Sequence, residues 1–414
     1  MRSGLLALAV VGATALLAAL PARAWPIGAG GDVAIDNFSA TSKDGATLLI
    51  PHADFVNTNL SKDEIQALLN PDTPQADKRA LAEKFKADKI SAPTIEIDPK
   101  DGAKIKLRDV LASKVDGGRV ERFGFSGAES STTGDASPVS LKSGPMQIEG
   151  LDVADALKAV DGSGGGKTGR LEHLTWSDID IVAPDSQGPA SKPVRIALGG
   201  VELRSGYSGD TLKDGSTKLS GVVIEPAPDS DAGKNLAALG YAKVELAAEV
   251  DATYEAHAKT LTLDNFTIDG LGMGSIAVKA NFTDVPPELL SGDSAAARLP
   301  ALLGCGIASL ELRLVNAGLF EKSLALAAKQ QGVTPEALAQ QWAAMVGQMA
   351  PLFLAGSPSA LAAAAETQKF IASPHSLTVS LKAKGGPLTA SDLAGVSDPA
   401  AFLGKVDIAA KANP

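Results

Sequence analysis

Cysteine and histidine are nearly absent from this chain of 414 residues, which contains one Cys and four His. A single Cys excludes a disulfide within the chain, a cysteine-based zinc site and a CxxC redox pair. The four His are scattered, at positions 52, 173, 257 and 375, and leave little for metal binding or acid–base catalysis. We therefore expect Cys305 and all four His to be dispensable, and we expect no metal and no cofactor.

Clusters of basic residues are missing too. The chain has 38 Lys and Arg against 48 Asp and Glu, a formal net charge of −10. An acidic total without a Lys/Arg block disfavours nucleic acid and anionic membrane surfaces as partners. Gly-x-Ser-x-Gly and His-Glu-x-x-His, two common hydrolase motifs, do not occur. These absences predict a protein that is not an enzyme and does not bind nucleic acid.

Residues 1–24 have the three parts of a secretory signal peptide. A basic start is followed by an apolar run of 16 residues that ends at Leu20, and an Ala-x-Ala end closes the segment at Ala24. The run is shorter than the about 20 residues that span a bilayer, and no second run of that length follows. Cleavage before Trp25 leaves 36 basic against 48 acidic residues, a net charge of −12. We expect a periplasmic or secreted protein that is not integral to the membrane after cleavage; the alternative is an uncleaved N-terminal anchor.

Residues 25–290 form the predicted β-rich region. Two alternating stretches, 94–98 and 103–107, flank the pair Asp101-Gly102, a pattern typical of a β-hairpin. Residues 260–270 and 275–282 are further candidate strands. Alternation puts apolar and polar side chains on opposite faces, which predicts antiparallel sheet.

Short helices are expected to interrupt this region at about residues 61–88. Ser61 and Glu64 have the spacing of a capping box, and Leu60 with Ile65 has that of a hydrophobic staple. Thr73-Pro74 is expected to begin a second short helix.

An internal repeat supports a sheet built from similar units. Residues 119–126, RVERFGFS, recur as RLEHLTWS at 170–177. The segment 137–148 has its counterpart at 192–203, with the glycines at 144 and 199 in the same place. We interpret each copy as two strands joined by a polar loop, so that repeated hairpin units extend one sheet.

Residues 291–372 have the pattern of a helical cap, and residues 373–414 that of returning strands. Thr334-Pro335-Glu336 begins the clearest helix, and Ser357-Pro358 begins the next. Strands followed by segregated helices favour an α+β class. The predicted fold is therefore α+β, an extended twisted antiparallel β-sheet built from repeated hairpin units, with a C-terminal helical cap.

The candidate site lies on the helix that begins at Thr334. One face of that helix carries Leu338, Trp342, Met345 and Met349. Such a stripe is typical of core packing against a sheet. Where the helices stand off the sheet, the same four residues would line a groove for an acyl chain, since Met adapts to loosely specified apolar ligands.

Other motifs have plainer interpretations. The segment 161–168, DGSGGGKT, is one residue from a P-loop, but the residues before it do not form the strand that a P-loop requires, which favours a linker. Asp178 and Asp180 could act as paired carboxylates, although surface acids are the commoner reading. Cys305 in apolar surroundings is typical of an inert buried thiol.

Several segments in the C-terminal half occur together in a familiar order. They are LGYAKVEL at 239–246, TLTL at 260–263, LGMGSI at 271–276, GLFEK at 318–322 and QGVTPE at 331–336. The series resembles exported, β-rich bacterial proteins of unknown function that are distantly similar to AsmA-like envelope proteins. That resemblance implies envelope biogenesis or lipid transfer along a long curved sheet. It contains no catalytic signature, so no functional residue is carried over.

The sequence thus favours a periplasmic, non-enzymatic envelope protein that binds or scaffolds, with a lipid or another apolar ligand, or envelope proteins, as partners. The alternative is a secreted or surface protein-interaction module without a small ligand. A hydrolase with an unrecognised site is the third and least favoured class, because the hydrolase motifs are missing.

Overall fold

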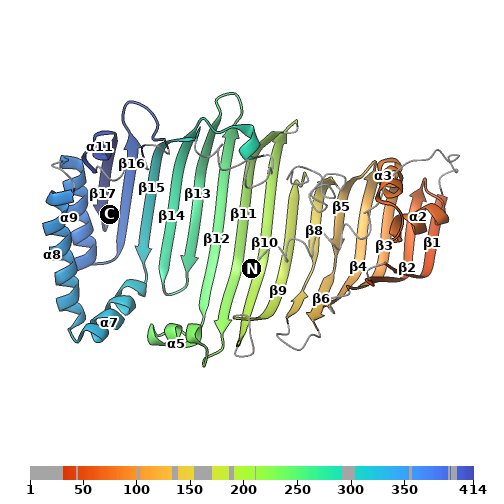
Figure 1. The fold of residues 1–414 in the computed structure, drawn as a ribbon, viewed down its shortest axis with the longest axis horizontal. Coiled ribbons are helices and arrows are strands. Elements are labelled where there is room, and N and C mark those ends of the chain that lie inside the picture. The colour runs from red at the N-terminus through yellow and green to blue at the C-terminus, as the bar shows by residue number, and fades with distance from the viewer. Residues whose placement is uncertain are drawn as a thin grey trace. The chain divides into compact units, whose positions relative to one another are not determined.

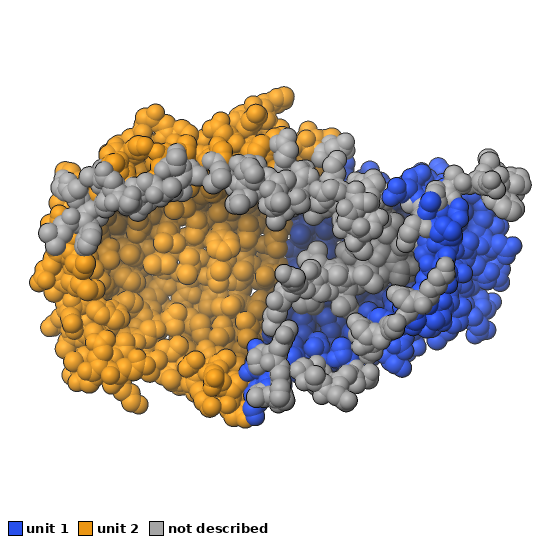
Figure 2. All heavy atoms as spheres, in the orientation of Figure 1, with its two compact units in different colours: residues 1–205 blue, residues 206–414 orange. Residues whose placement is uncertain are grey.

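The computed structural model describes residues 31–42, 45–99, 103–132, 139–152, 170–185, 191–209, 211–290, 304–353, 357–389, 392 and 399–414. Its 17 strands pair with antiparallel neighbours, and most helical residues follow β15 (Figure 1). The predicted α+β class, with an antiparallel β-rich sheet and C-terminal helices, is confirmed. The chain divides into two compact units, residues 1–205 and 206–414 (Figure 2). The proposed signal peptide, the turn at 100–102 and the P-loop-like segment lie outside the described residues.

Unit 1 holds the first strands and two short helices. In chain order these are β1 (Gly31–Thr41), β2 (Thr47–Thr58), α2 (Lys62–Leu69), α3 (Gln75–Lys84), β3 (Lys86–Asp98), β4 (Ala103–Asp116), β5 (Arg119–Phe125), β6 (Gly127–Thr132), β7 (Ser140–Ser143), β8 (Met146–Asp152), β9 (His173–Pro184) and most of β10 (Pro193–Ser208).

The predicted local signals of unit 1 are present. The hairpin of β3 and β4 places Ile95 opposite Leu107. Ser61 and Glu64 form the capping box at the start of α2, and Ile65 is fully buried. Pro74 was expected to be the first helical residue of α3. In the structure it is the cap residue, and the helix begins at Gln75.

The two copies of the sequence repeat adopt the same pairing register. In the first copy Arg122 lies opposite Glu149, and in the second His173 lies opposite Arg204. His173 follows Arg122 by 51 residues, and Arg204 follows Glu149 by 55 residues. These are the offsets between the two copies in the sequence. The repeated hairpin is therefore a structural unit, although β5 with β6 and β7 with β8 are interrupted where β9 and β10 are continuous.

Kinks along the strands keep apolar side chains on one face of unit 1. The buried residues of β4 are Ile105, Leu107, Val110, Ala112 and Val115, spaced alternately by two and three residues. The three-residue steps pass over Asp109 and Lys114, whose φ angles are 47° and 50°. Aspartate tolerates this left-handed conformation better than most residues. Each kink resets the alternation, so the strand bends while its apolar side chains stay inside.

One large hydrophobic core results in unit 1. It joins residues of β1 to β9 with the inward side of α2, and its largest fully buried side chains include Phe55, Phe85 and Phe123. Cross-strand ion pairs occupy the exposed side, such as Lys106 with Glu96 at 2.8 Å. Unit 1 thus buries one face of its strands and exposes a charged one.

Unit 2 holds the remaining strands and the longer helices. These are β11 (Thr211–Pro226), α5 (Asp231–Ala238), β12 (Val244–Glu255), β13 (Thr260–Gly270), β14 (Gly274–Thr283), the 3-10 helix η1 (Pro287–Leu289), β15 (Gly306–Asn316), α7 (Leu319–Gln331), α8 (Pro335–Phe353), α9 (Pro358–Ala372), β16 (Ser376–Ala383), α11 (Pro399–Gly404) and β17 (Val406–Ala412).

One prediction for unit 2 is wrong. Residues 306–316, assigned to the helical cap, form strand β15 between β14 and β16. Leu310, Leu312 and Leu314 alternate with Glu311 and Arg313, so the period is two and not 3.6. The surrounding Ala- and Leu-rich composition obscured this alternation. The helices that begin after Thr334 and at Ser357 are present as α8 and α9, and Ser357 caps α9.

Within the described residues, no helix combines the length and the apolar character needed to cross a membrane.

Candidate apolar binding surface

Strands β12 to β15 of unit 2 carry one continuous apolar face. Directly paired residues of an antiparallel sheet share a face, and Ile268, Ile276 and Leu314 form one such row across three strands. Phe266, Val278 and Leu312 form the next row. We define the apolar face of unit 2 as Val250, Phe266, Ile268, Ile276, Val278, Leu310, Leu312 and Leu314.

This face is not closed by a core. None of its eight side chains is buried; Ile276 is 44% exposed, and Leu310 is exposed as well. The equivalent inward residues of unit 1 are nearly all buried. Figure 2 shows a broad hollow in the surface of unit 2. A contiguous apolar surface that remains open to solvent is a common mark of a binding site.

The opposite face of the same strands is polar. Arg313 lies opposite Ala277, and Glu311 lies opposite Lys279. These residues alternate with the apolar ones along each strand, so the charged side chains lie on the face opposite to the apolar side chains. The bulky apolar side chains of these strands therefore gather on one side of the sheet, with Val315 as an exception.

Helices α8 and α9 stand against one border of the apolar face and leave a groove there. The groove has a volume of about 380 Å³, within the range of ligand pockets of roughly 300 to 1,000 Å³. Val379 of β16 lies in it and is paired with Leu312, so the groove continues the apolar face. Its lining is Val346, Met349, Ala350, Ala360, Ala363, Ala364, Thr367, Val379, Ile408 and Ala410.

Polar contacts and aromatic rings hold α9 in place. The Glu366 carboxylate accepts a 2.9 Å hydrogen bond from the backbone N–H of Ala412, and this bond is the main reason that the pKa of Glu366 is lowered. Gln368 donates to the carbonyl of Ala343 on α8 at 2.8 Å. At its end, Phe370 meets Phe320 edge to face at 5.6 Å. The helix therefore forms a fixed wall beside the groove.

The four residues proposed from the sequence do not form one site. Leu338 is buried with Leu324 and Ala328 where α7 packs on α8, and Trp342 packs beside them, 6.5 Å from Phe320. Met345 is exposed and lies outside the groove lining. Met349 alone lines the groove. The helical stripe thus divides between a core contact and the groove.

The remaining lining residues were missed as site residues. The sheet residues alternate in the sequence, but alternation does not reveal which apolar face stays uncovered. Small residues are the better signal, since Ala360, Ala363 and Ala364 of α9 and Ala410 of β17 leave room between the helix and the strand.

The candidate catalytic histidines of unit 1 lie between pairs of carboxylates. Among the described residues, no group of three His, Cys, Asp or Glu side chains could hold a metal ion. His52 lies between Asp36 at 2.7 Å and Asp54 at 3.1 Å, and hydrogen bonds to the two carboxylates raise its pKa. His173 lies between Glu149 and Glu202.

Two further candidates have similar explanations. Burial, and then the charge of Asp284, raise the pKa of the Cys305 thiol, which makes the reactive thiolate scarcer. Asp180 pairs with Arg195 at 2.7 Å, and this hydrogen-bonded pair lowers the pKa of Asp180. Its predicted partner Asp178 has a φ of 53°, at a kink of β9.

Part of the chain matches a known family model. Residues 267–413 match a family model described as an uncharacterized protein. That segment contains β14 to β17 and α7 to α9, and therefore most of the apolar face and the groove. The search of curated proteins finds no match to the chain.

Proposed function

We propose that this chain is an exported, non-enzymatic protein of the cell envelope that binds an acyl chain on the apolar face of unit 2. The open apolar face of β12 to β15 carries the proposal. Removing apolar surface from water is favourable by about 25 cal/mol per Å², and the exposed side chains of this face do not gain that free energy in the free protein. A bound acyl chain would bury this surface without needing hydrogen bonds.

The groove supports an elongated ligand. Its lining is almost entirely aliphatic, with Thr367 as the polar exception among the residues named above, and it continues into the row that contains Leu312. A chain seated between α9 and β16 could extend over that row toward β13. Such a surface selects for apolar character and length, since it offers few groups that recognise a headgroup.

The proposed location rests on the sequence. The basic start, the apolar run and the Ala-x-Ala end of residues 1–24 favour export. The resemblance to AsmA-like envelope proteins agrees with a lipid ligand.

A matched pair of variants tests the binding face. Val278 and Ala277 are neighbours on β14 whose side chains point to opposite faces. Val278→Asp puts an unpaired charge into the binding surface, so we expect it to weaken binding of a fluorescent fatty acid at least about tenfold. Ala277→Asp places the same charge beside Arg313, and binding should be unchanged. Circular dichroism checks that both variants fold.

Native mass spectrometry of the purified protein supplies a second readout. Co-purified lipid supports the proposal. Absence of lipid, together with no fatty-acid binding by the unaltered chain, would contradict it and favour the alternative of a protein-interaction module.

A further inference from the structure

The end of unit 2 at the turn between β13 and β14 exposes apolar side chains. Leu271 at the tip is 70% exposed, the largest exposure of any bulky apolar residue in the described part of the chain. Leu319, the first residue of α7, is also exposed. Its backbone N–H donates to the carbonyl of Met273, which places the start of α7 beside this turn.

The fold demands glycine in this turn but does not demand leucine. The N–H of Met273 donates to the Gly270 carbonyl at 2.9 Å, and Gly272 has a φ of 66°. A Cβ on Gly274 would lie 2.1 Å from the carbonyl oxygen of Val315. These contacts explain the glycines. A polar residue at position 271 would serve the turn equally well.

The turn is held in one conformation. The Tyr241 hydroxyl donates to the Gly272 carbonyl at 2.8 Å, and the Lys322 ammonium lies 3.5 Å from the centre of the Tyr241 ring. Tyr and Lys are amphipathic side chains that favour the boundary between apolar and aqueous surroundings. Leu271 is thus presented on a fixed support, with such residues directly behind it.

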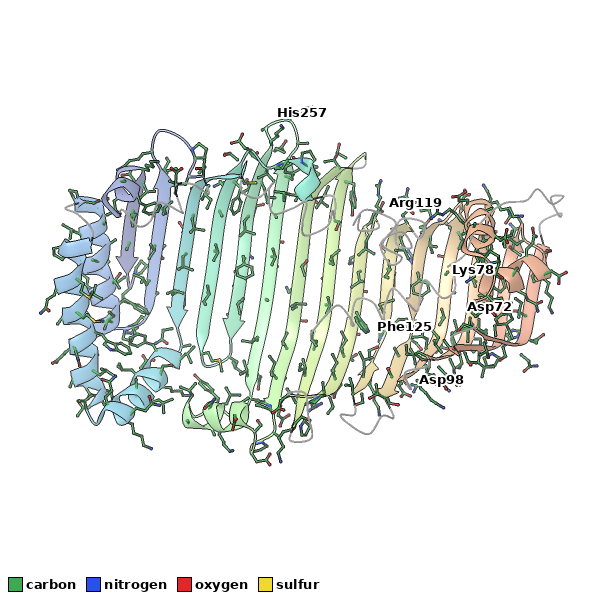
Figure 3. All side chains as sticks on the ribbon, viewed as in Figure 1. Asp72, Lys78, Asp98, Arg119, Phe125 and His257 are labelled. Carbon is green, nitrogen blue, oxygen red and sulfur yellow. The ribbon has the colours of Figure 1, made fainter. Side chains whose placement is uncertain are left out.

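The other end of the same strands is different. The turn between β12 and β13 carries Ala256, His257, Ala258 and Lys259, all exposed and none of them bulky and apolar. Figure 3 labels His257 at that end, away from α5 and α7. Among the described residues, the turn between β12 and β13 therefore shows no counterpart to the exposed Leu271.

We propose that the end formed by Leu271, Met273 and Leu319 docks on a zwitterionic lipid surface, with Leu271 inserted among the acyl chains. This inference rests on the proposed function, because the apolar face begins two residues from the turn, at Ile268 and Ile276. A ligand leaving the bilayer at this end would meet apolar surface at once. The chain has an acidic net charge, so burial of apolar side chains, and not attraction between charges, would hold it on the vesicle. We therefore expect binding to be insensitive to salt.

Vesicle flotation tests the docking. The chain that begins at Trp25 is mixed with vesicles of phosphatidylcholine and phosphatidylethanolamine, at low and at high salt. We expect the unaltered chain to float with the vesicles in both. Loss of one inserted leucine should weaken binding about tenfold, so Leu271→Gln should float less and Leu271→Gln/Leu319→Gln less still. Leu111→Gln, at an exposed leucine of unit 1, is the control and should float normally.

Fatty-acid binding in solution, measured on the same variants, separates the two proposals. We expect it to be unchanged, because neither leucine lies on the defined apolar face. A chain that does not float, or a double variant that floats like the unaltered chain, would overturn the docking proposal. Association with an envelope protein but not with lipid vesicles would overturn it as well. Absence of fatty-acid binding by the unaltered chain would instead count against the proposed function.

Discussion

Replacing one isoleucine in each unit by alanine compares a closed apolar face with an open one. Ile95 of β3 is 1% exposed, and Ile276 of β14 is 44% exposed. Both strands have a partner on either side, so the loss of β-propensity is similar for the two changes. The difference between the two effects therefore reports how far each side chain is buried in solution.

The expected magnitudes differ by a factor of two or more. Ile95→Ala removes side-chain atoms from a packed core, which typically costs about 2 to 5 kcal/mol. Ile276→Ala removes atoms that are about half exposed, so we expect about 1 kcal/mol. Urea unfolding, followed by circular dichroism, gives both values, and the two units are allowed separate transitions.

An equal cost at the two positions would refute this reasoning. It would mean that the apolar face of unit 2 is covered in solution, and the proposed binding surface would not exist in the free protein. The comparison is best made after any bound lipid is removed, because a ligand would raise the apparent stability of unit 2.

Three further predictions follow from the sequence and the local contacts. The protein isolated from its host should begin at Trp25 by mass spectrometry, whereas an intact N-terminus in the membrane fraction would show a retained anchor. His52 should titrate above its usual pKa of about 6.5 by NMR, and Asp36→Asn should lower that value; because the pKa is raised in the folded state, the stabilisation is complete below pH 6.5 and fades as pH rises through the folded pKa. Cys305→Ser should fold and bind fatty acid normally, and stoichiometric bound zinc would contradict the prediction of no metal.

Local patterns predicted much of the fold because the deciding interactions are close in sequence. The alternation at 94–98 and 103–107 was sufficient for the β3–β4 hairpin, and the capping box of Ser61 and Glu64 for the start of α2. The repeat predicted a common hairpin, and its offsets match the pairing registers. The hairpin and capping signals are local in the sequence, and each copy of the repeat contains its own hairpin.

Other features of the fold had no such local signal. In β4 the buried residues step by two and then by three, and the kinks at Asp109 and Lys114 put a search for strict alternation out of phase. β15 was hidden by helix-like composition, although its leucines alternate.

The site required tertiary information. Leu338 and Met349 share a helical stripe, yet one is buried against α7 and the other lines the groove, because different neighbours pack along α8. The apolar face of unit 2 is built from residues of four strands, and its sequence pattern resembles that of a closed sheet. Whether a helix covers it is decided by the packing of α8 and α9 at one border.

Photolabelling tests the central claim, that an acyl chain binds on the apolar face of unit 2, most directly. A fatty acid with a photoreactive diazirine on its chain is bound to the protein and irradiated, and the labelled peptides are identified by mass spectrometry. We predict labels in β13, β14 and β15 and in α9, competed away by an excess of unlabelled fatty acid. Labels confined to residues 31–205, or labelling that the competitor does not reduce, would contradict the claim.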